Sequence, residues 1–87
     1  MDVIDINIGA GKRFTVRVDI NIETSANYQC WVAYSDGTAA NIGTRNFNEE
    51  FAFVAAKNIT GIGISIAKLN VPYECTVIVS NPESAFN

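Results

Sequence analysis

Six residues with the chemistry of ligand recognition fall between positions 31 and 46 of the chain. They comprise two aromatic rings, one acid, one guanidinium and two amides: Trp31, Tyr34, Asp36, Arg45, Asn41 and Asn46. Aromatic rings pack against the C–H face of a sugar, and amides and charged groups bond its hydroxyls. The stretch predicts a site for a carbohydrate or a protein surface, centred on Trp31 and the hairpin and loop over 34–46.

Trp31 is the only tryptophan, and three interpretations of it compete. It can belong to the core, because large aromatic side chains are usually mostly buried. It can lie in an interface between copies of the chain, where Trp and Tyr are enriched. It can also be an exposed platform for a ligand. Alternation along the strand places Trp31 on the face away from Cys30 and Val32, so the core interpretation requires that assignment to be reversed.

The chain has few of the residues and motifs that enzymes use for catalysis. There is no histidine, which removes Ser–His and Cys–His pairs and histidine metal sites. Residues 9–12 lack the spacing of a phosphate loop, and no segment has the ligand spacing of a calcium loop. We therefore predict a protein that is not an enzyme, with no cofactor and no metal site.

Two cysteines, Cys30 and Cys75, both lie on predicted core faces. One interpretation is a disulfide between strands, which would contribute about 2–4 kcal/mol by closing a long loop. The other is two buried thiols that behave as small hydrophobic side chains. The sequence leaves both open.

The amount and distribution of charge indicate which kinds of partner the protein can bind. The net charge is −3, and the six basic residues are scattered, so we expect no nucleic-acid partner. No stretch reaches the roughly 20 apolar residues of a membrane span, and the first residues do not resemble a signal peptide. With only 17% charged residues, an oligomer is a further expectation. The compartment is not determined by these features.

Several short segments alternate between apolar and polar residues, as strands with one dry face do. The clearest is 14–22, whose dry face carries Phe14, Val16, Val18, Ile20 and Ile22. Other predicted strands cover 3–8, 27–34, 38–42, 59–67 and 73–79. Six to seven short strands with turns between them predict a small, single-domain antiparallel β-sandwich over 1–80, with a C-terminal tail over 81–87. The alternatives are a small barrel, or an α+β fold with one helix near 48–57.

The sequence indicates which segments are strands more clearly than which strands pair with each other. Strands 3–8 and 14–22 can form a hairpin with Ile8 opposite Phe14, or one slipped by two residues with Ile6 opposite Phe14. Alternatively, the two strands lie in different sheets. The Asp36-Gly37 pair predicts a two-residue turn that sets Trp31 opposite Ile42, with the returning strand broken at 43–44. Residues 45–58 favour a strand, but Asn48 also suits a helix cap.

Three function classes follow. The first is a binding module for a carbohydrate or a protein surface. The second is a self-assembling structural protein, such as a virion or filament component, that covers its apolar face or sheet edge with copies of itself. The third is a small acidic inhibitor or immunity-type protein that blocks a basic target.

Overall fold

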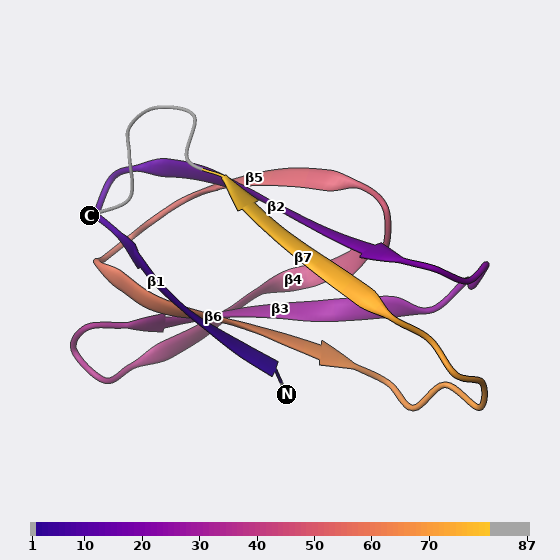
Figure 1. Ribbon diagram of the computed structural model, residues 1–87. Coiled ribbons are helices and arrows are strands. Elements are labelled where there is room, and N and C mark those ends of the chain that lie inside the picture. Colours follow the sequence, from indigo (N-terminus) through magenta and orange to yellow (C-terminus); the bar gives the residue numbers. More distant parts are fainter. Residues whose placement is uncertain (1, 81–87) are drawn as a thin grey trace.

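The computed structural model describes residues 2–80, which form two antiparallel sheets packed as layers (Figure 1). One sheet has four strands in the order β1-β6-β3-β4, and the other has three in the order β5-β2-β7. The strands are β1 (Asp2–Ile8), β2 (Arg13–Ile20), β3 (Asn27–Tyr34), β4 (Ala39–Asn46), β5 (Glu50–Val54), β6 (Ile59–Ile66) and β7 (Cys75–Ser80). The predicted all-β sandwich is confirmed. The predicted tail over 81–87 lies outside the described residues.

Strand β2 is the centre of the three-stranded sheet, and its dry face is fully buried. Phe14, Val16 and Val18 each have 0% of their surface exposed. Across the core they meet the inner face of the four-stranded sheet, where Cys30, Val32 and Ile62 are equally buried. Burying each large aliphatic or aromatic side chain contributes about 1.5–3 kcal/mol, so this strand anchors the fold.

Strands β1 and β2 lie in different sheets, which was one of the three predicted arrangements. The hairpin with Ile8 opposite Phe14 does not form, because β1 pairs with β6 and β2 pairs with β5 and β7. Residues 9–12 carry the chain between the sheets, with the Lys12 amide bonded to the Gly9 carbonyl at 3.1 Å. Two strands that each have one apolar face can bury those faces in the same core whether they lie in one sheet or in two facing sheets.

The hairpin between β3 and β4 has a three-residue loop, so the predicted two-residue turn is wrong. The Tyr34 amide donates to the Thr38 carbonyl at 2.8 Å, and the Gly37 amide donates to the Tyr34 carbonyl at 3.1 Å. Gly37 has a φ of 87°, the left-handed conformation that ends a three-residue loop. The register moves by one residue, and Trp31 faces Asn41 instead of Ile42.

Strand β4 runs through the predicted break at 43–44 by means of a bulge. Trp31 pairs with Asn41 and Cys30 with Gly43, which leaves Ile42 as the extra residue. Gly43 has a φ of 124°, a conformation that favours glycine. Because the bulge resets the alternation, Ile42 is buried in the core while Asn41 stays on the outer face.

Residues 50–54 form a strand, and the helix alternative near 48–57 is wrong. Asn48 has a φ of 64°, its amide donates to the Val18 carbonyl, and its side chain accepts from the Ile20 amide. Asn48 therefore ties the turn to β2 instead of capping a helix. Strand β5 then pairs with β2, and Phe53 packs edge-on against Phe14 with ring centres 5.9 Å apart.

Candidate binding surface

Trp31 lies on the outer face of the four-stranded sheet. Its neighbours in the strand, Cys30 and Val32, point into the core with 0% and 1% exposure, so alternation turns Trp31 outward. The indole is partly exposed and is flanked by Gly63 of β6 on one side and Asn41 of β4 on the other. The interpretation of Trp31 as a core residue is therefore wrong.

A shallow apolar hollow of about 150 Å³ adjoins the indole. Six residues of four strands line it, and all of them are apolar or glycine: Trp31, Val3, Ala33, Ala39, Val32 and Gly63. Of these residues only Trp31 was predicted from the sequence as part of the site, and Val3, Ala39 and Gly63 were missed. The sequence does carry a signal for this glycine, because Gly61 and Gly63 flank Ile62, and glycines within a strand indicate a bulge or a close approach of the backbone.

The glycines of β6 keep this part of the face flat. Gly63 lies directly between Val3 and Trp31 in the register, so no β6 side chain separates them. Gly61 lies between Asp5 and Ala33, and a methyl group built on it would meet Val3 Cγ1 at 3.4 Å. The hollow is thus framed by side chains of β1 and β3 across a strand without side chains at two positions.

The rest of this outer face is polar but uncharged on β3, β4 and β6. Cross-strand pairing places six amide and hydroxyl side chains on this face: Asn27, Gln29, Asn41, Thr44, Asn46 and Ser65. Asn27 donates a hydrogen bond to Asn46, and the Asn41 side chain accepts one from the Gly43 amide at 2.7 Å. The edge strand β1 adds one charged residue to this face, Asp5, which pairs with Gly61.

The indole N–H of Trp31 is shielded from solvent and has no acceptor within residues 2–80. Buried donors are nearly always paired, and an unpaired one costs about 1–3 kcal/mol. Packing therefore fixes the position of Trp31, and no hydrogen bond from its Nε1 atom contributes.

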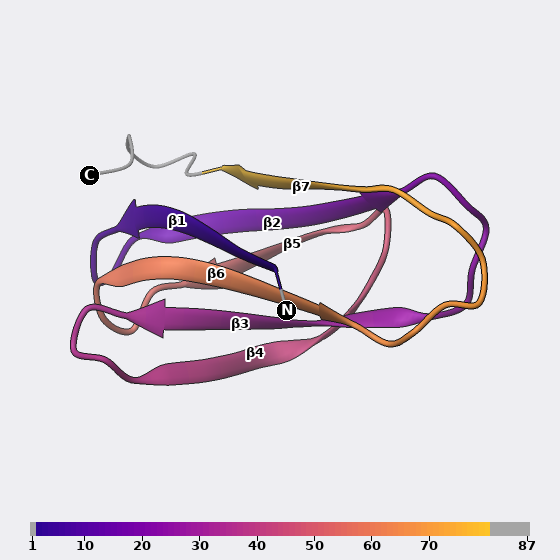
Figure 2. The ribbon, with the colours of Figure 1, turned by 60° about the horizontal axis from the view of Figure 1, so that its bottom comes forward.

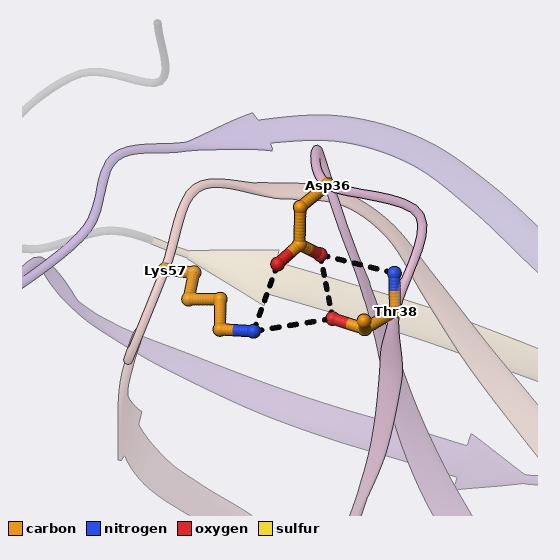
Figure 3. Close-up of polar contacts among 3 residues, drawn as sticks. All are labelled: Asp36, Thr38 and Lys57. Atoms are coloured by element: carbon orange, nitrogen blue, oxygen red, sulfur yellow. Dashed lines mark hydrogen bonds and ion pairs between the residues drawn. The ribbon is translucent and has the colours of Figure 1, made fainter.

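Two further residues of the predicted site, Tyr34 and Asp36, make contacts at the β3–β4 end of the sandwich instead. Tyr34 is buried at the end of β3, with the Lys57 ammonium 5.4 Å from its ring centre. Asp36 in the β3–β4 turn accepts from Lys57 Nζ at 2.8 Å and from the Thr38 amide and hydroxyl (Figure 3). The hydrogen bonds from Lys57 and then Thr38 hold the pKa of the Asp36 carboxyl well below its usual range.

Arg45 belongs to the opposite end of β4 and faces the inner side. It pairs with the buried Tyr28, its guanidinium lies over the Phe51 ring at 4.1 Å, and Nη2 donates to the Ile42 carbonyl at 3.1 Å. Arg45 Nε is buried without an acceptor within the described residues. A polar pocket of about 230 Å³ adjoins it, but Glu49 and Glu50 line that pocket, which makes it unfavourable for an anionic ligand.

The structure brings together three of the six predicted residues. Trp31 and Asn41 are direct neighbours on the outer face, and Asn46 lies farther along the same face. Tyr34 and Arg45 turn to the other side of the sheet, and Asp36 is fixed in the turn. The candidate site is therefore a sheet face around Trp31, and the 34–46 hairpin contributes to it only through the outward side chains of β4.

Within residues 2–80 no disulfide joins Cys30 and Cys75, which corresponds to the second interpretation drawn from the sequence. Cys30 is fully buried on the inner face of β3, and burial raises the pKa of its thiol to about 11. Burial likewise raises the pKa of the neighbouring Tyr28 hydroxyl to about 12. Neither group offers a nucleophile or a base at neutral pH.

Comparison with known proteins adds no assignment. No family model, no curated protein and no solved structure matches this chain. Within residues 2–80 no three or more Cys, Asp or Glu side chains are grouped so that they could hold a metal ion. Over the same residues there is no helix long and apolar enough to cross a membrane.

Proposed function

We propose that this protein is a non-enzymatic binding module that engages a carbohydrate or a protein surface through the outer face of its four-stranded sheet. The observation that carries the proposal is the position of the only tryptophan. Trp31 lies partly exposed on a face that is uncharged over three strands, beside a hollow that is lined by apolar groups.

The chemistry of the face suits a neutral polar ligand. A sugar ring presents C–H groups that pack in an apolar hollow, and its hydroxyls bond to amides and hydroxyls such as Asn41, Gln29 and Thr44. A protein surface of the same character, with an apolar centre and an uncharged polar rim, would fit as well. An acidic inhibitor would need a negative face, and the side chains that β3, β4 and β6 contribute here carry no charge.

The unpaired indole N–H of Trp31 supports the same function. Because this donor has no acceptor within residues 2–80, only packing fixes the orientation of the ring. A ligand oxygen that accepts from Nε1 would offset the cost of burying that group, provided that the ring tilts to expose it. The proposal therefore expects the environment of Trp31 to change on binding.

The first test follows Trp31 emission in the dilute protein, where a partly exposed indole should emit at long wavelength and be quenched by acrylamide. Ligands are then screened with neutral polysaccharides and with candidate proteins, each at low salt and at about 0.5 M salt, where surface charge pairing is strongly screened. A ligand of this face should shift the emission and keep its affinity at high salt.

The decisive comparison is between Trp31→Ala and Tyr73→Ala, measured by retention on the immobilised ligand. Tyr73 is an exposed aromatic residue in the β6–β7 loop and serves as the matched control. Trp31→Ala should abolish retention while its circular dichroism stays native, and Tyr73→Ala should bind normally. A folded Trp31→Ala protein that still binds with full affinity would exclude this face as the site.

A further inference from the structure

Over residues 2–80 the sandwich has four edge strands, because each of the two sheets ends in two strands. An edge strand presents unpaired backbone N–H and C=O groups that can pair with another chain. Proteins block such edges with charges, bulges or short strands. Three of the four edges here carry these features: β1 has a register shift and Asp5, β4 has its bulge and Arg45, and β5 has five residues and begins at Glu50.

The fourth edge, β7, carries none of them. Its six residues from Cys75 to Ser80 pair with β2 without any register shift, and the segment contains no charged residue and no proline. Figure 2 shows β7 (yellow) running along the outer side of β2, with no other strand of the described chain beyond it. Among the described residues, β7 is therefore a regular edge strand without a protective feature.

The side chains of β7 are also incompletely covered. Val77 and Val79 point to the core side, yet they are only partly buried, whereas Val16 and Val18 on the paired strand β2 are fully buried. On the outer side, Ile78 is 46% exposed. A further strand beside β7 would cover apolar surface on both faces of the sheet.

The chemistry of this edge favours a second copy of the same chain. Two identical strands bring identical charges together, so an edge with Asp5 or Glu50 would meet its own carboxylate. Strand β7 has no charge to repel. An antiparallel pairing centred on Val77 keeps apolar side chains on the core side in both copies and sets Thr76 beside Ile78 on the outer side.

We propose that β7 pairs with β7 of a second copy in antiparallel register, so that the two three-stranded sheets form one continuous six-stranded sheet. The twofold axis is perpendicular to that sheet, because antiparallel neighbours in one sheet keep the same face. The outer faces of the two four-stranded sheets then point in the same direction. The dimer would present two copies of the Trp31 face to one ligand surface, although the pairing itself does not rest on the function proposed above.

Six strand residues make a small interface, so we expect a dimer that dissociates on dilution. Light scattering after size exclusion, from about 10 μM to 1 mM protein, should show the molar mass rising from 9.4 kDa toward twice that value. In the same series, amide exchange in β7 should slow with concentration for the backbone groups that face away from β2. A molar mass of one chain throughout the series would overturn the proposal.

The matched variants are Ile78→Lys and Val54→Lys. Both side chains are exposed hydrophobic residues on edge strands of the same sheet, at 46% and 56% exposure. Ile78→Lys places like charges across the proposed seam and should raise the dissociation constant at least about tenfold. Val54→Lys should leave it unchanged.

Circular dichroism of both variants shows whether each is folded, and the exchange data on the wild-type chain test the seam independently of any variant. Equal dimerisation of Ile78→Lys and Val54→Lys, or concentration-dependent protection in β1, β4 or β5 instead of β7, would assign the interface elsewhere. If the dimer forms and Trp31→Ala still binds ligand, the proposed binding face fails while the β7 pairing stands.

Discussion

Replacing Gly43 by alanine tests whether the β4 bulge has the geometry described here. Gly43 has a φ of 124°, and a methyl group built on it would lie 3.1 Å from Arg45 Nε. The substitution therefore strains the backbone and displaces the guanidinium that covers Phe51. Gly61→Ala is the matched control, because a methyl group there makes an ordinary contact at 3.4 Å with Val3 Cγ1 and no positive φ is involved.

The expected loss can be worked from these contacts. A strained φ costs about 1–3 kcal/mol. Losing the Arg45–Phe51 contact costs about 0.5–1 kcal/mol, and losing the hydrogen bond to the Ile42 carbonyl costs about 0.5–1.5 kcal/mol. We expect Gly43→Ala to lower the free energy of unfolding by about 3 kcal/mol and Tm by about 12–24 °C. A chain of this size has a total stability of only about 4–13 kcal/mol, so the effect is large.

Urea unfolding of both variants provides the measurement, with the transition midpoint compared at constant slope. Gly61→Ala should change stability by less than about 1 kcal/mol, because the gain from a less flexible unfolded chain offsets a close contact. In an Arg45→Ala background the penalty of Gly43→Ala should shrink by about 1 kcal/mol, since the guanidinium is no longer displaced. Equal stability of Gly43→Ala and Gly61→Ala would refute the bulge as described.

Two further predictions concern titratable groups. The pKa of Asp36 is lowered in the folded protein, so its contribution to stability is present above the ordinary carboxyl range, near pH 4, and is lost as the pH falls through its folded-state pKa. Thermal melts from pH 7 to pH 2 should therefore show a steeper loss for the wild type than for Asp36→Asn, and parallel curves would contradict the ion pair with Lys57. Burial raises the pKa of Cys30 to about 11, so in Cys75→Ser only about one thiol in a thousand is ionised at pH 8. That protein should react with a thiol reagent only after urea is added, and rapid reaction of the native form would show that Cys30 is accessible.

Much of the fold could be predicted because strand patterns are local. The alternation around Phe14, Val16 and Val18 identified β2, and the predicted strand over 27–34 has the bounds found in the structure. The same alternation placed Trp31 on the face opposite Cys30. These predictions need only the direction of successive side chains, which is fixed by the backbone itself.

The candidate site was predicted only in part, because its composition depends on register. A turn one residue longer than expected moved Asn41 opposite Trp31, and the bulge at Gly43 turned Arg45 to the inner side. Val3 and Gly63 come from strands 28 residues before and 32 residues after Trp31 in the chain, so no local pattern could join them to it. Asn48 was equally ambiguous, since a short amide side chain serves a helix cap and a left-handed turn alike.

The sequence by itself determined that the chain forms short strands, which side chains of each strand share a face, and that no histidine is present for catalysis. Only the tertiary structure decided that β1 and β2 lie in different sheets, which strands became edges, and that Trp31 lies on an outer sheet face. The physical reason is that alternation specifies a strand's two faces but not its neighbours. Neighbours are chosen by the packing of the whole core, where Phe14, Cys30 and Ile62 must be buried together.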